Sequence, residues 1–169
     1  MKNMKNWPIL LLFLFFCGSC THENDCPRKA KAILEPIDNS GVKGIVFFSE
    51  EKQGVKIIGE FSGLTPGEHG LHIHEYGDCE NTGGHFNPHN APHGGPFDSP
   101  GHAGDLGNVN ANSSGHARFE RLDFVITLDG SESVLGKSIM ITKFKDDFSS
   151  QPSGNSGPGV ACGIIVPIK

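Results

Sequence analysis

Several histidines and one aspartate stand at spacings that suit a metal site. His72 and His74 lie two residues apart in HGLHIHEY, so on a strand both imidazoles would project from the same face. The later motifs GGHFNP, PHGGP and HAGDLGN contain, in order, His85, His93, His102 and Asp105. Three imidazoles and one carboxylate make a complete tetrahedral zinc set. The residue types therefore predict a zinc site with further imidazoles close by.

The three later histidines belong to a long segment, 77–104, made of Gly, Pro, Asn and His with almost no apolar residues. Such a length is unusual for an idle connection in a compact domain. Without hydrophobic residues the segment needs another source of order, and metal ligation supplies one. A solvated loop would leave the Gly-Gly and Asn-Pro turns around the histidines unexplained.

Short strands must position these ligands. The 169 residues suffice for one ordinary domain, and 23 glycines with 11 prolines punctuate the chain in the manner of an all-β sandwich or barrel. Alternating apolar residues between turn residues predict strands within 30–37, 42–49, 54–64, 69–76, 106–112, 116–122, 124–128, 138–142 and 160–168. The first three should form an antiparallel meander.

The first twenty residues have the pattern of an export signal. Lys2 and Lys5 precede the unbroken apolar run 9–16, which is too short for a permanent membrane span. The run leads to Gly18-Ser19-Cys20, which looks like a bacterial lipoprotein signal with Cys20 as the lipidated residue; a plain secretory signal is the alternative. We therefore expect a signal peptide at 1–20, a tether at 21–29, a folded domain at 30–169, and a location in the periplasm or at the cell surface, anchored by lipid.

Export makes a disulfide plausible. Of the cysteines after the signal, Cys79 and Cys162 lie inside folded segments and are the natural pair, whereas Cys26 falls in the tether.

The formal charge of −5, without clustered Lys and Arg, argues against a nucleic-acid partner.

Taken in order, GLTPGEHGLHIHEYGDC, GGHFNP, HGGP, HAGDLGN and GVACGIIV resemble the copper/zinc superoxide dismutase family from Ala30 to Lys169. The resemblance implies an eight-stranded Greek-key β-barrel and a Cys79–Cys162 disulfide. It also implies a carboxylate, Asp146, that links the copper and zinc ligands from behind. The implied copper ligands are His72, His74 and His85, and the implied zinc ligands are His85, His93, His102 and Asp105, with His85 bridging the two metals.

The same resemblance implies dismutation of superoxide to oxygen and hydrogen peroxide, but two family positions depart. Counting back from Asp146 places Thr142 at the fourth copper histidine, and counting back from Ala161 places Gly159 at the arginine that orients the anion. A hydroxyl is a poor copper ligand, since copper prefers imidazole nitrogen. No histidine follows His116 that could take its place.

Two functional predictions follow from these departures. One is a superoxide dismutase with reduced activity, its copper site completed by water or by a spare group such as His89, and its anion field supplied in part by Lys143 and Lys145. The other is a non-catalytic family member that keeps zinc and binds or passes on copper. The expected partners are superoxide, as the substrate, and a membrane, through the lipid. A homodimer is compatible with the sequence, which does not fix the oligomeric state. We expect His69 to be structural and His116 to face water.

Overall fold

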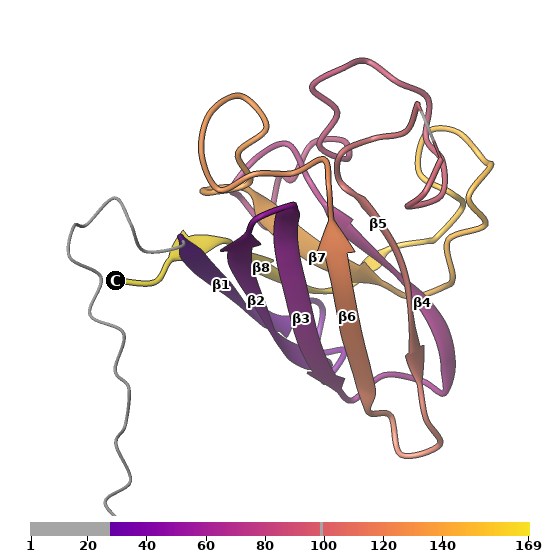
Figure 1. Cartoon of the computed structure of the whole chain (residues 1–169). Coiled ribbons are helices and arrows are strands. Elements are labelled where there is room, and N and C mark those ends of the chain that lie inside the picture. The colour runs from indigo at the N-terminus through magenta and orange to yellow at the C-terminus, as the bar shows by residue number, and fades with distance from the viewer. Residues whose placement is uncertain (1–27, 99) are drawn as a thin grey trace, which may run out of the picture.

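The computed structural model describes residues 28–98 and 100–169 (Figure 1). The expected export signal, Cys20 and Cys26 lie outside the described residues. Within them the chain forms strands and loops without a helix. The strands are β1 (Lys29–Pro36), β2 (Lys43–Glu51), β3 (Gly54–Ser62), β4 (Gly67–Ile73), β5 (Asp105–Ala111), β6 (Ala117–Asp123), β7 (Ser138–Thr142), β8 (Gly159–Ile164) and the short β9 (Val166–Pro167).

The strands make one antiparallel sheet in the order β5-β4-β7-β8-β1-β2-β3-β6, and β9 pairs with β1. The two edges, β5 and β6, are joined by a tight turn and lie beside one another, so the sheet curls into a nearly closed barrel (Figure 1). The connections from β3 to β4 and from β6 to β7 cross between distant strands, as in a Greek key. The expected all-β barrel and the meander of β1, β2 and β3 are confirmed.

Strand alternation separates the barrel core from the outward face that carries His72. Leu71 and Ile73 of β4 and Ile139 and Ile141 of β7 are fully buried in the core. Because successive side chains point to opposite faces, His72 must then project outward, toward the loops.

The expected strand at 124–128 is wrong. This segment is a loop that carries only an isolated bridge between Thr127 and Ser133. The Asp123 carboxylate accepts hydrogen bonds from the amides of Val125 (2.8 Å) and Ile126 (3.1 Å), which bends the chain at the end of β6. Ile126 is buried, so its hydrophobicity reflects core packing rather than strand pairing.

Two long loops cover the outward face of β4. One, 74–104, joins β4 to β5, and the other, 143–158, joins β7 to β8; Figure 1 places them next to each other on one side of the barrel. No helix among the described residues is long and apolar enough to cross a membrane.

Candidate metal centre

Backbone hydrogen bonds fix the first loop against the end of β4. The amide of Phe86 donates to Ile73 O (2.8 Å), and the amide of Gly104 donates to Phe86 O (2.9 Å), so the middle and the end of the loop meet at one point. An isolated bridge pairs His74 with His85. The loop therefore brings His85 next to His72, in β4, and His74, which directly follows β4.

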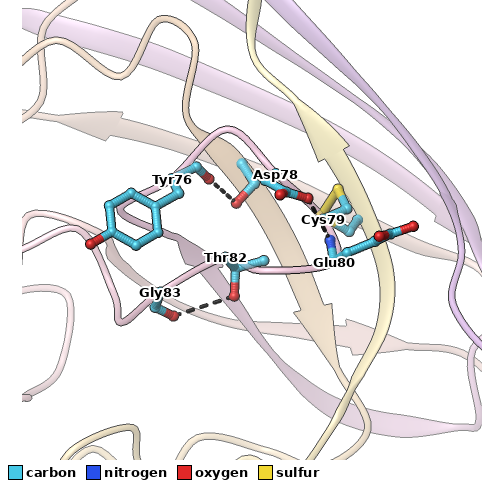
Figure 2. The surroundings of a disulfide bond; sticks show 8 residues. Tyr76, Asp78, Cys79, Glu80, Thr82 and Gly83 are labelled. Atoms are coloured by element: carbon cyan, nitrogen blue, oxygen red, sulfur yellow. Dashed lines mark hydrogen bonds between the residues drawn. A yellow bond between two sulfur atoms is a disulfide. The ribbon is translucent and has the colours of Figure 1, made fainter.

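A disulfide between Cys79 and Cys162 ties the same loop to β8, across a sequence separation of 83 residues. Figure 2 shows Cys79 in its turn, where the amide of Glu80 donates to Asp78 Oδ1 (2.9 Å). The pairing is the one expected from the sequence.

His85, His93, His102 and Asp105 form a cluster that could hold a metal ion, because one ligand atom of each lies within 4.8 Å of all the others. The Asp105 carboxylate stands at the centre of the group. Its oxygens lie 2.7 Å from His85 Nδ1, 3.0 Å from His93 Nδ1 and 3.3 Å from His102 Nδ1. This donor set is the one that tetrahedral zinc takes.

His72 and His74 approach the same His85 from its other side. The His72 ring stacks on His85 with 4.0 Å between the ring centroids, and the His74 ring meets His85 edge-on at 5.1 Å. The expectation that both imidazoles project to one side therefore agrees with the structure. Imidazole nitrogen is a ligand that suits zinc, copper and iron.

Whether metals fit the centre can be tested on its buried ring nitrogens that have no hydrogen-bond partner. Among the described residues these atoms are His72 Nδ1, His74 Nε2, His93 Nδ1 and His102 Nδ1. A buried polar atom without a partner is costly, and an imidazole nitrogen with a free lone pair is a metal ligand. One metal therefore fits the His/Asp cluster, and His72 and His74 carry two further free ring nitrogens next to the His85 ring.

Asp146, in the second loop, connects the two halves of the centre. Its fully buried carboxylate lies 2.8 Å from His72 Nε2 and 2.9 Å from His93 Nε2. Both rings donate to it, so both carry their proton on Nε2 and keep Nδ1 free. Gly154 (φ 66°) makes room for this contact, because a Cβ there would lie 2.6 Å from His93 Nε2 and would clash with the carboxylate.

Two residues that support the centre have no signal in the sequence. Asn108 of β5 donates to Asp146 O (2.9 Å) and accepts from Asp146 N (2.8 Å), so it fixes the backbone behind the carboxylate. Gln151 bonds in the same reciprocal way to the backbone of His93. Their partners are 38 and 58 residues away, and only the path of the loops brings them together.

Burial favours the neutral form of His72, His74 and His85. Desolvation lowers the pKa of His72 and His85, and it lowers the pKa of His74 to about 4. Burial alone would raise the pKa of Asp105 and Asp146, but hydrogen bonds from the neighbouring rings and amides outweigh it and lower both. Neutral imidazoles beside ionised carboxylates are the protonation states that metal binding requires.

Two comparisons decide the family. The family model of copper/zinc superoxide dismutase matches residues 42–165. The chain is also 40% identical over 141 residues to an extracellular superoxide dismutase [Cu-Zn] of Brugia pahangi, covering 76% of this chain and 71% of the relative. The chain belongs to the copper/zinc superoxide dismutase family. A crystal structure of the clock protein EA4 shares the fold, with a TM-score of 0.77 and 36% identity over 86% of this chain and 98% of that one.

The structure makes Thr142 and Gly159, the two positions at which the sequence resemblance predicts a departure, register partners across β7 and β8. Thr142 is buried, and its hydroxyl lies 3.2 Å from Gly70 O and 3.1 Å from Phe144 O. The hydroxyl is thus occupied by backbone carbonyls. Gly159 places no charge beside it.

The structure agrees with the expectations for His69 and His116. His69 is buried, and its ring nitrogens lie 2.9 Å from Thr65 O and from Thr142 O, a structural role. His116 is exposed. His89 has an exposed side chain that pairs with Glu132 at 3.2 Å, which gives it a partner other than the three imidazoles. Lys143 and Lys145 are exposed at the start of the second loop.

Proposed function

We propose that this chain is an exported metal-binding member of the copper/zinc superoxide dismutase family that dismutes superoxide only weakly. Zinc would be held by the cluster of His85, His93, His102 and Asp105, and copper by the three imidazoles of His72, His74 and His85. Copper supplies the one-electron chemistry by which two superoxide anions and two protons become oxygen and hydrogen peroxide. The protein contributes neutral ligands, the shared His85 ring and the Asp146 carboxylate that keeps His72 Nδ1 free.

One observation carries the proposal: the four rings with an unpartnered buried nitrogen surround His85, with His72 and His74 in one pair and His93 and His102 in the other, while the hydroxyl of Thr142 is already bonded to carbonyl oxygens. The zinc set is complete, and the copper set is one imidazole short. A ligand set changed in this way shifts the balance between the two oxidation states of copper. Without a cation at Gly159, the anion also loses an anchor for the last part of its approach.

A second function, copper binding or transfer without turnover, is favoured by the same departures. Three imidazoles hold reduced copper adequately, since this ion tolerates low coordination. Lys143 and Lys145 are solvent-exposed and offer a positive field to an anion only in part. With this second function, the chain would bind zinc for stability and release copper to a partner.

The location and partners remain proposals from the sequence. Cys20 would carry lipid and anchor the protein to the membrane, on the periplasmic side or at the cell surface. The relative from Brugia pahangi is named as extracellular, which supports export. A homodimer would be compatible with the exposed barrel surface.

Metal analysis and a superoxide assay on the same sample test the proposal. The protein is loaded with zinc and copper, and we expect about one tightly bound zinc, weaker copper and slow turnover. Robust turnover at stoichiometric copper would overturn the weak-enzyme proposal. Zinc binding with copper but without any turnover would select the copper-transfer alternative.

A further inference from the structure

We propose that the thioether of Met140 is a copper ligand that stands in for the missing fourth imidazole and makes the site prefer reduced copper. The inference rests on the proposed copper site of His72, His74 and His85. It assigns a role to a residue that the family pattern leaves without one.

Met140 lies on the strand next to that of His72. Met140 of β7 is opposite His72 of β4. Its neighbours Ile139 and Ile141 are fully buried in the barrel core, so the Met140 side chain emerges on the outward face, as that of His72 does. Residues directly opposite in an antiparallel pair have Cβ atoms about 4.5–5.5 Å apart, which is within reach of a methionine side chain.

The side chain is also directed toward the position of the two departures. A Cβ on Gly159 would clash with Met140 Sδ and would lie 2.9 Å from its Cγ and 3.0 Å from its Cε. Gly159 in turn pairs with Thr142. The thioether therefore occupies the space in which an arginine side chain at position 159 would begin.

The edge of the His72 ring points toward Thr142. A Cβ on Gly70 would lie 2.7 Å from His72 Cε1 and 2.7 Å from Thr142 Oγ1, so the ring edge and the Thr142 hydroxyl meet at one place. His72 Nδ1, bonded to that same Cε1, is buried and has no hydrogen-bond partner. The sulfur, next to Gly159 of β8, and the His72 ring edge, next to Gly70 of β4, thus lie on either side of Thr142, the position of the absent imidazole.

Two features argue that Met140 is more than a filler. It is partly exposed and lies outside the barrel core, so packing does not require its length and flexibility. A thioether is a soft ligand that selects Cu(I), whereas the imidazoles accept both oxidation states. Three imidazoles and one thioether would retain reduced copper and disfavour its reoxidation, as the weak activity proposed above requires.

The test measures Cu(I) affinity without any turnover. The zinc-loaded full chain is titrated anaerobically with Cu(I) against a chromophoric Cu(I) chelator, and Met140→Leu, of similar volume, is compared with the unchanged protein. We expect Met140→Leu to weaken Cu(I) binding by about tenfold or more, and Cu(II) binding by less, with zinc affinity unchanged. X-ray absorption of the Cu(I) protein should contain a copper–sulfur contribution that disappears in Met140→Leu.

A His74→Ala variant separates failure of the ligand from failure of the site. If Met140→Leu binds Cu(I) as tightly as the unchanged protein while His74→Ala binds it weakly, the site exists and Met140 is not a ligand. If His74→Ala has no effect, the proposed copper site itself is wrong. If Met140→Leu misfolds and loses its zinc affinity, the unchanged protein still provides a test. The absence of a copper–sulfur contribution from its X-ray absorption would overturn the inference.

Discussion

Replacing Asp146 by asparagine should weaken copper binding more than zinc binding. The carboxylate accepts from His72 Nε2 through Oδ2 and from His93 Nε2 through Oδ1. An asparagine of the same shape offers one accepting oxygen and one donating NH₂ group. Only one of the two rings can therefore keep its present tautomer.

The amide of Phe148 decides which ring changes. It donates to Asp146 Oδ1 (2.7 Å), the same oxygen that faces His93. An NH₂ group at this position would meet a second donor, so the asparagine should place its oxygen there and its NH₂ against His72. The His72 Nε2 atom must then accept, and its proton moves to Nδ1, the nitrogen that copper needs. Loss of such a supporting hydrogen bond costs about 10–100-fold in affinity, or about 1.4–2.7 kcal/mol.

Chelator competition at neutral pH measures both metals on Asp146→Asn, with Asp147→Asn as the matched control. Asp147 is an exposed neighbour whose carboxylate bonds to Ser149 and Ser150, and its variant should keep both affinities. Circular dichroism checks the fold of each. Equal copper affinity in Asp146→Asn and the unchanged protein, or a larger loss for zinc than for copper, would refute the reasoning.

Three further predictions concern activity and stability. Thr142→His should raise copper affinity by about tenfold or more and increase superoxide turnover; a variant with unaltered copper titration and rate would contradict the alignment of this position. Cys79→Ser or Cys162→Ser should lower the free energy of unfolding by about 4–5 kcal/mol, because the bond closes a loop of 83 residues, and denaturant titration with and without the bond measures this. In the metal-free protein burial lowers the pKa of His74 from 6.5 to about 4, so the unfolded chain binds the proton first. His74 should therefore reduce the free energy of unfolding by about 3 kcal/mol between pH 6.5 and pH 4, and His72 and His85, whose pKa values are also lowered, should add to this loss. Urea titrations measure the change, and a flat profile would contradict the burial.

The sequence was sufficient for the local elements and for the residue types of the centre. Alternation and turn residues marked the strands, and HxH spacing placed two imidazoles on one face, because strand geometry is local. The same pattern failed at 124–128, where the apolar residue Ile126 serves the core from a loop. Periodicity alone cannot separate a short strand from an inward-packed loop.

The supporting contacts depended on the tertiary structure. Asn108 and Gln151 reach their partners only after both loops have folded over β4, and no short-range pattern records such a pairing. Met140 is similar: in the sequence it is an apolar residue of a strand, and only the register of β7 against β4 sets it opposite His72.

The sequence by itself predicted the fold class and the metal-ligand types, and its resemblance to the family implied the departures at Thr142 and Gly159. The fold class and ligand types follow from composition, strand periodicity and ordered motifs, which are properties of short stretches of chain. Only the tertiary structure decided that the Thr142 hydroxyl bonds to carbonyl oxygens, that Asp146 holds two rings in one tautomer, and that Met140 is the register partner of His72. The reason is that sheet register and loop closure join residues that are far apart in the chain, and ligand geometry depends on those distant contacts.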